Sequence, residues 1–331
     1  MTDVGRTGLA DQVTARRWIG PAALWLAAAA VLATACSMLA GLLWIGEMAV
    51  HFRVQYAVAG LLASAGLAWA RRPVWALVAL AVAAANALIA AAVMGVSPAR
   101  AEGAAAQSGT PLRVVSLNVL YGNRRHEAVI DFIRSESPDL AVLVEMTARW
   151  REALTALHEA YPYRFATHGP AGKGVLLLSR WPILHATEVP LEGDDEPAVA
   201  ATLQVGSRKM HVLGVHTTCP ATPGLTALRD RQLDRLGRLV SRMGTDGAPV
   251  VVLGDLNVSP FSPRFPALLE AGGLASAAEG FGWQPTWPTF LPPAGIQIDH
   301  VLITDGIAVQ RFRRGPDVGS DHLPVVVDLV L

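Results

Sequence analysis

Three long runs of apolar residues occupy the first third of the chain, at positions 21–45, 54–70 and 74–96. A helix needs roughly 17–25 such residues to cross the hydrocarbon core of a bilayer. Tryptophans lie near the ends of these runs, where an indole ring can sit between lipid and water. The pattern predicts a membrane anchor over residues 1–96 that contains three transmembrane helices.

Arginines are distributed unequally among the short segments that flank the three runs. Five of them precede the first run or separate the second run from the third, whereas two lie on the other side. Cytoplasmic loops of membrane proteins carry the excess of Lys and Arg. We therefore expect a multi-pass protein of the cell membrane with a cytoplasmic N-terminus, and three crossings place the rest of the chain outside the cytoplasm.

The segment 97–110 is small, polar and without periodicity, which predicts a flexible linker. A flexible chain of this length has an end-to-end distance of roughly 20 Å. The linker would therefore keep the domain that follows, residues 111–331, close to the membrane surface.

Residues 111–331 alternate short β-branched runs with amphipathic stretches. Because strands outnumber helices and several are neighbours in sequence, the pattern favours two packed sheets with helices outside, a two-sheet α/β sandwich. Strands are predicted at 112–119, 140–144, 174–179, 199–205, 210–215, 249–253, 300–303 and 324–329, and helices at 126–135, 148–160 and 226–243.

Charge changes this picture in one respect. Only 16% of the residues are charged, against roughly 25% in an average soluble protein, and the shortfall lies in the apolar third. Residues 110–331 contain 20 basic and 23 acidic residues, a net charge of −3. Because phosphate contacts dominate the affinity of nucleic-acid binders, this balance disfavours nucleic acid as a partner.

Polar residues stand where the predicted apolar strands end. Each of them alone is more typical of a turn, a cap or a solvated position than of a catalyst. Strand ends, however, gather at one edge of a sheet, so their side chains could converge on one site. These residues are Asn118, Glu145, His216, Asp255, Asn257, Asp299, Asp321 and His322.

The order of these motifs resembles the endonuclease/exonuclease/phosphatase superfamily. The series is LNV, a glutamate at a strand end, VH, GDLN, IDH and SDH, and the stretches SRWP at 179–182 and TWP at 286–288 also match in type. The resemblance covers residues 112–331 and implies a two-sheet α/β sandwich with the active site at one end.

The resemblance assigns a role to each residue. It implies that Glu145 is the principal metal ligand, that Asn118 holds its neighbourhood, and that Asp321 is a further ligand or lies just behind one. Carboxylates and an amide without thiolates suit a hard, oxygen-ligated cation, so Mg²⁺ is expected, with Mn²⁺ or another divalent cation as the alternative.

The remaining residues are expected to carry the catalytic steps. The resemblance implies that Asp255 orients or deprotonates the attacking water and that Asn257 binds a phosphoryl oxygen. It implies that His216 faces the phosphate and that Asp299 pairs with His322, which favours the charged imidazole. Whether Asp255 or His322 is the general base stays open.

The superfamily includes nucleases, inositol phosphatases and sphingomyelinases, so the fold alone does not select a substrate. A three-span anchor followed by an external domain is similar to the VanJ-type membrane phosphatases, which are linked to teicoplanin resistance. That likeness implies a lipid-linked phosphate or pyrophosphate substrate, undecaprenyl pyrophosphate above all, with membrane lipids as partners and no protein partner.

Two alternatives remain at this stage. One is an extracytoplasmic nuclease or phospholipid phosphodiesterase of the same fold. The other is a non-catalytic membrane binding or scaffold protein, against which the full set of catalytic residue types argues.

Overall fold

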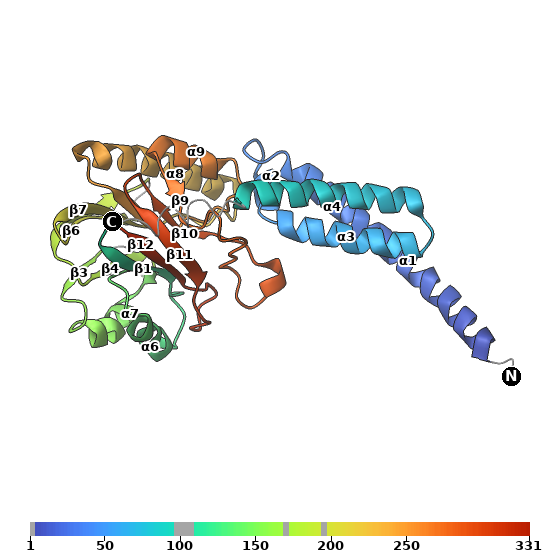
Figure 1. The fold of residues 1–331 in the computed structure, drawn as a ribbon, viewed down its shortest axis with the longest axis horizontal. Coiled ribbons are helices and arrows are strands. Elements are labelled where there is room, and N and C mark those ends of the chain that lie inside the picture. The colour runs from blue at the N-terminus through green and yellow to red at the C-terminus, as the bar shows by residue number, and fades with distance from the viewer. Residues whose placement is uncertain (1–3, 96–108, 168–171, 193–196) are drawn as a thin grey trace. The chain divides into compact units, whose positions relative to one another are not determined.

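The computed structural model describes residues 4–95, 109–167, 172–192 and 197–331, with the side chains of residues 4–17 left out (Figure 1). The chain divides into two compact units, Met1–Val93 and Met94–Leu331. All but the last two residues of the predicted linker, 97–110, lie outside the described residues.

The first unit is entirely helical. Its helices are α1 (Val4–Ser37), α2 (Trp44–Val50), α3 (Arg53–Trp69) and α4 (Pro73–Met94). Among the described residues, two stretches are long and apolar enough to cross a membrane, Trp18–Ser37 of α1 and the whole of α4. Helix α3 has 17 residues and is shorter than either. The count of three spans therefore stays a prediction.

The first predicted run is not one continuous helix. Helix α1 ends at Ser37, and a turn in which Gly41 has φ 81° separates it from α2. Polar side chains join the helices inside the unit: the amide of buried Asn86 on α4 accepts from Arg53 of α3 and donates to Thr34 of α1. Such interhelical hydrogen bonds satisfy polar groups that lipid cannot.

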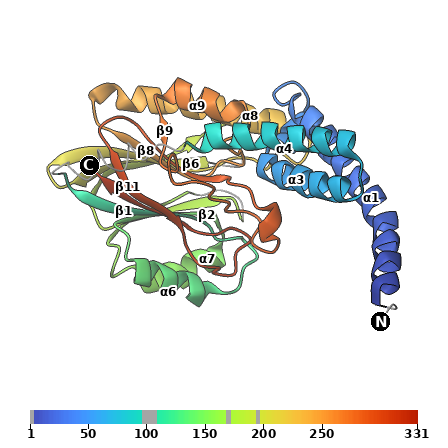
Figure 2. The same cartoon turned by 45° about the vertical axis from the view of Figure 1, so that its right-hand side comes forward.

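The second unit contains two six-stranded sheets packed face to face (Figure 2). The first has the order β11-β12-β1-β2-β4-β3, and the second has the order β5-β6-β7-β8-β10-β9. Pairs β1–β2 and β7–β8 are parallel, and the other pairs are antiparallel. The strands are β1 (Pro111–Asn118), β2 (Leu140–Met146), β3 (Tyr163–Ala166), β4 (Gly174–Ser179), β5 (Ile183–Pro190), β6 (Pro197–Val205), β7 (Arg208–His216), β8 (Val250–Asp255), β9 (Ala275–Ser276), β10 (Asp299–Ile303), β11 (Ala308–Arg314) and β12 (Val325–Val330).

Helices cover the outer face of each sheet (Figures 1 and 2). Residues of β1, β2 and β4 pack against α6 and α7 on one side, and residues of β6, β7 and β8 pack against α8 and α9 on the other. A third cluster fills the space between the sheets. The predicted two-sheet α/β sandwich is confirmed. The helices are α6 (His126–Glu136), α7 (Ala148–Ala153), α8 (Pro223–Met243) and α9 (Arg264–Gly272), with 3-10 turns at η1 (Leu154–Leu157), η2 (Gly244–Asp246) and η3 (Pro292–Ala294).

Gly254 allows the strand β8 to approach β7 where the site begins. Its φ is +151°, and a Cβ at this position would lie 1.7 Å from the carbonyl oxygen of Val215. No other residue type fits without moving one of the two strands. The glycine of the GDLN motif is therefore a requirement of the sheet that carries Asp255.

Candidate active site

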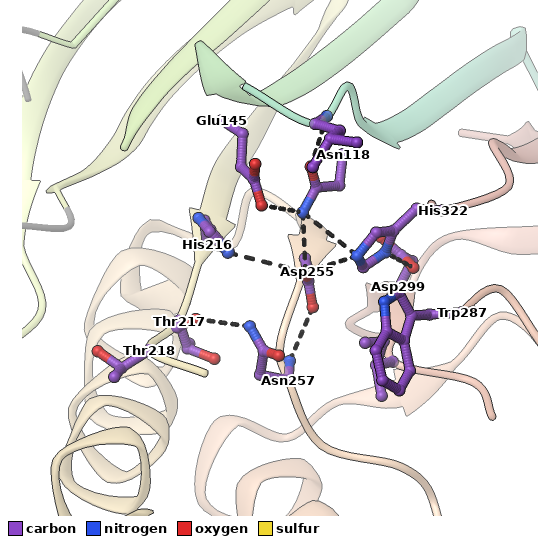
Figure 3. A network of polar contacts seen from close by, with 12 residues as sticks. Asn118, Glu145, His216, Thr217, Thr218, Asp255, Asn257, Trp287, Asp299 and His322 are labelled. Carbon is purple, nitrogen blue, oxygen red and sulfur yellow. Dashed lines mark hydrogen bonds and ion pairs between the residues drawn. The ribbon is translucent and has the colours of Figure 1, made fainter. Parts of the chain in front are cut away.

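The predicted residues converge at one edge of the two sheets (Figure 3). In the second sheet, the register pairs His216 with Asp255 across β7–β8 and pairs Asp255 with Asp299 across β8–β10. In the first sheet, Asn118 ends β1, and Glu145 follows its partner Val144 in β2. Register aligns these residues within each sheet, and the packing of the two sheets brings the two groups together.

One amide bridges the two sheets. The Nδ2 atom of Asn118 donates to Glu145 Oε1 at 2.9 Å and to Asp255 Oδ2 at 3.1 Å. The Oδ1 atom of Asn118 accepts from the backbone N–H of Leu120 at 3.0 Å, which fixes the orientation of the buried side chain. Asn118 thus holds the carboxylates of Glu145 and Asp255 near each other.

A β-bulge turns Glu145 toward this edge. The pairing of β2 with β4 shifts register between Val144 and Met146, and Glu145 between them has φ +63°. A left-handed backbone in a non-glycine residue costs on the order of 1–3 kcal/mol and is typical of functional sites. The Oε2 atom of Glu145 accepts from the backbone N–H of Tyr121 at 2.9 Å. The carboxylate is half-buried, so a solvated ion can reach it.

Asp255 is the buried acid at the centre of the network. Its Oδ1 accepts from the backbone N–H of Asn257 at 2.9 Å, and its Oδ2 lies 3.7 Å from Nε2 of both His216 and His322. Burial raises the pKa of Asp255 to about 6, although the two histidines act to lower it. A carboxylate with this pKa is ionised at neutral pH and is basic enough to accept a proton.

His322 is held by a second carboxylate. Its Nδ1 lies 2.8 Å from Asp299 Oδ2, and both side chains are buried. Burial opposes the charged imidazole, but the carboxylates of Asp299 and Asp255 outweigh it and raise the pKa of His322 to about 10. An imidazolium at neutral pH donates from both nitrogens and cannot act as a base. The raised pKa of His322 therefore favours Asp255 as the proton acceptor.

Asp321 lies beside His322 and binds a tryptophan. Its Oδ2 accepts from Trp287 Nε1 at 3.1 Å, and its Oδ1 is 4.0 Å from His322 Nε2. Sequence reasoning noted TWP at 286–288 but gave Trp287 no role. Thr286, in the same stretch, accepts through Oγ1 from the backbone N–H of Asp299 at 3.3 Å.

Two residues of α8 hold the loops that carry His216 and Asn257, and sequence reasoning missed both. Arg229 donates through Nη1 to the carbonyl oxygen of Asn257 at 2.6 Å, and Gln232 accepts through Oε1 from the backbone N–H of Thr218 at 2.8 Å. The side chain of Asn257 joins the two loops, because its Nδ2 donates to the carbonyl oxygen of Thr217 at 2.8 Å. Both α8 side chains are buried, which a helical pattern alone does not reveal.

His300 belongs to the IDH motif but does not face the network. Its Nε2 bonds the carbonyl oxygen of Val258 at 2.8 Å, and its ring packs against Phe265. Burial lowers the pKa of His300 to about 4, so the ring is neutral and anchors the loop after Asp255.

The donor atoms fit a divalent cation. Within the described part of the chain, Oδ1 of Asp299 and Oδ1 of Asp321 are buried and accept no hydrogen bond, which a cation would remedy. Asp255, Asp299 and His322 are spaced closely enough to hold an ion, each offering one atom within 4.8 Å of the others. A protonated His322 cannot ligate a metal, however. The predicted carboxylates of Glu145 and Asp321 suit a hard cation, whereas the predicted ligand Asn118 turns its amide nitrogen to Glu145 and bonds its oxygen to Leu120 N–H.

Comparisons with known proteins agree with this geometry. Residues 115–322 match the model of the endonuclease/exonuclease/phosphatase family. Solved structures with the same fold include truncated Caenorhabditis elegans TDP2 (18% identity, TM-score 0.57, 67% of this chain and 98% of that one) and sphingomyelinase C from Streptomyces griseocarneus (20%, 0.52, 66% and 99%). A third is an endonuclease/exonuclease/phosphatase from Beutenbergia cavernae (24%, 0.54, 67% and 72%). Among curated proteins, none matches the chain by sequence.

The chain belongs to the endonuclease/exonuclease/phosphatase family, and it is a hydrolase of that superfamily. At identities below 25%, the solved structures establish the fold and leave the substrate to be argued from this chain.

Proposed function

We propose that the protein is a membrane-anchored phosphohydrolase that uses a divalent cation, Mg²⁺ in the first place, and acts outside the cytoplasm on a lipid-linked pyrophosphate. The observation that carries the proposal is the combination, in one chain, of this family's catalytic residues with helices long and apolar enough to cross a membrane. A tether raises the effective concentration of the domain toward membrane-borne substrates.

Undecaprenyl pyrophosphate is the favoured substrate. The net charge of −3 over residues 110–331 does not favour a nucleic acid, and the architecture resembles that of VanJ-type membrane phosphatases. Hydrolysis of the terminal phosphate needs no energy source and returns the monophosphate carrier. Expression of such an enzyme would alter sensitivity to glycopeptides such as teicoplanin.

The residues divide the chemistry between them. A cation bound by Glu145 and its neighbours would neutralise charge on the phosphoryl oxygens. Asp255 takes the proton of the attacking water, since it is ionised at neutral pH and buried beside the histidines. The charged His322 stabilises the negative charge that develops opposite it. His216 turns its Nε2 toward the network, 3.7 Å from Asp255 Oδ2, and we assign this nitrogen to the leaving oxygen.

Hydrolysis by the full-length protein in detergent tests the substrate, followed as phosphate release from the lipid pyrophosphate and the inositol phosphates, as strand cleavage of DNA and as phosphocholine release from sphingomyelin. We expect turnover of undecaprenyl pyrophosphate and much slower turnover of DNA, sphingomyelin and inositol phosphates. Rapid cleavage of DNA with no release from the lipid would replace the phosphatase with a nuclease, and hydrolysis of sphingomyelin would replace it with a phospholipid diesterase. Inactivity on all four substrates, with the fold intact, would favour a binding protein.

Orientation has its own test. The arginine distribution predicts a cytoplasmic N-terminus and an external C-terminus. A reporter that fluoresces only in the cytoplasm, fused after Leu331, should stay dark, while the same reporter before Met1 should fluoresce. Strong fluorescence from the C-terminal fusion would place the domain inside and remove lipid carriers of the outer leaflet as substrates.

A further inference from the structure

An uncharged segment lies next to the active site. Over the 18 positions 281–298 there is no Asp, Glu, Lys, Arg or His, although residues 110–331 contain 20 basic and 23 acidic residues. Three large apolar side chains of this segment are exposed, Phe290 at 75%, Leu291 at 51% and Trp283 at 37%. Single exposed apolar residues are ordinary, but two consecutive ones on an uncharged segment mark an interaction surface.

The backbone of this segment is also poor in free donors. Four of its residues are prolines and carry no N–H. Other N–H groups in the segment are already bonded, those of Thr286, Trp287, Thr289, Ala294, Gly295 and Ile296. In lipid every backbone polar group needs an internal partner, because no water is present to bond it. The bonded groups flank Phe290 and Leu291, and the four prolines further reduce the number of N–H groups that need a partner.

Hydrogen bonds fix the segment to the rim of the site. The backbone N–H of Thr289 donates to the carbonyl oxygen of Asp321 at 2.9 Å, and its Oγ1 donates to the carbonyl oxygen of Ser320 at 2.9 Å. Phe290 and Leu291 follow directly. Both belong to the connection between β9 and β10, which Figures 1 and 2 draw in orange-red.

Another exposed aromatic residue adjoins the network at Glu145. Tyr121 is 64% exposed, and its backbone N–H donates to the carboxylate of Glu145. Tyr121, Phe290 and Leu291, here called the apolar rim, thus adjoin Glu145 and Asp321. A surface that held the rim would hold the carboxylates facing it.

We propose that the apolar rim inserts into the surface of a lipid bilayer and so aims the active site at phosphate groups carried by lipids. The bilayer is the favoured occupant because the same chain contains apolar helices that can anchor it there. Aromatic side chains partition to the boundary between lipid and water, and an uncharged loop meets no desolvation penalty for a charge. The lipid nature of the substrate rests on the proposed function, whereas insertion of the rim does not.

A fluorescent label tests insertion without reference to catalysis. The two native cysteines are first removed by Cys36→Ala and Cys219→Ser. An environment-sensitive dye is then attached to Phe290→Cys, and the full-length protein is placed in liposomes that contain no other protein. The matched control is Leu184→Cys, because Leu184 on the edge strand β5 is also apolar and 52% exposed. We expect the emission of the dye at position 290 to shift to the blue and to be quenched by spin-labelled lipids. The emission of the dye at position 184 should be that of a dye in water. Equal behaviour at both positions would overturn the proposal.

Kinetics test the consequence. For Phe290→Ser/Leu291→Ser, the ratio of turnover on undecaprenyl pyrophosphate in vesicles to turnover on a soluble short-chain pyrophosphate should fall about tenfold or more, since two apolar side chains that insertion would bury in lipid are lost. Leu184→Ser should leave the ratio unchanged. If the dye at position 290 inserts into lipid but the protein does not hydrolyse lipid pyrophosphate, insertion of the apolar rim is supported and the proposed function is rejected. If the dye stays in water and the double variant still hydrolyses the lipid substrate at the unaltered rate, insertion is rejected and the proposed function is retained.

Discussion

Replacing Glu145 by glutamine is expected to lower the rate of hydrolysis on the order of 10³-fold while the domain stays folded. A bound metal contributes several kcal/mol to stabilisation of the transition state, and 1.36 kcal/mol corresponds to a tenfold change in rate. Glutamine keeps the size of the side chain and can accept from Tyr121 N–H as the carboxylate does, but it lacks the charge that holds a cation. Folding should survive because Glu145 lies half-exposed at a strand end, outside the three apolar clusters.

Metal removal should reproduce this loss in the unaltered protein. A strong chelator is expected to abolish phosphate release, and Mg²⁺ or Mn²⁺ to restore it. Titration with Mn²⁺, followed by its paramagnetic signal, should show weakened binding in Glu145→Gln and normal binding in Glu152→Gln, a matched change on the exposed face of α7. Full activity in excess chelator would show that the cation is dispensable and would exclude this mechanism.

The strands of the two-sheet core could be predicted because their residues are buried on both faces. The segments that became β1, β2, β4 and β8 are nearly continuous apolar runs, which is the pattern of a strand covered on two sides. Strands β3, β5, β9 and β11 were missed, since they lie at sheet edges and few of their residues are buried. The short helix α9 was also missed, and the predicted helix 148–160 is α7 followed by a 3-10 turn.

The residues of the candidate site also fall into those that the sequence could predict and those that it could not. Asn118, His216 and Asp255 could be placed because the end of an apolar strand is visible in sequence and strand ends share an edge. Arg229 could not, because an arginine on an amphipathic helix is normally solvated. Only the folded structure shows that it is fully buried against the loop of Asn257.

The pairing of His322 with Asp299 is expected to control the proton transfer that Asp255 carries out. Loss of a positioned acid or base costs roughly 10²–10⁴-fold in rate, so His322→Ala should fall in that range and Asp299→Ala somewhat below it. Because the two side chains act as one unit at 2.8 Å, the double variant should be little worse than His322→Ala alone. Additive losses in the double variant would mean that the two residues act independently. The control variant is Asp246→Asn, which removes the carboxylate of a similar pair, His211 and Asp246 at 3.0 Å. That pair lies elsewhere in the domain, so the rate should stay unchanged.

The pH profile distinguishes this role from a merely structural one. Asp255 must be ionised and His322 charged, so the rate should fall below about pH 6 and above about pH 10. The pKa of His322 is raised by folding, so the stability linked to its charge is complete below the ordinary histidine pKa of about 6.5 and is lost as the pH rises through about 10.

Asp299→Asn removes a negative charge that raises the pKa of both groups, so both limbs of the profile should move to lower pH. His322→Ala removes a positive charge that lowers the pKa of Asp255, so its acidic limb should move to higher pH while the basic limb disappears. A variant that was only destabilised would lower the whole curve without moving its limbs. Opposite shifts of the acidic limb in the two variants therefore identify Asp255 as the group that the Asp299–His322 pair controls.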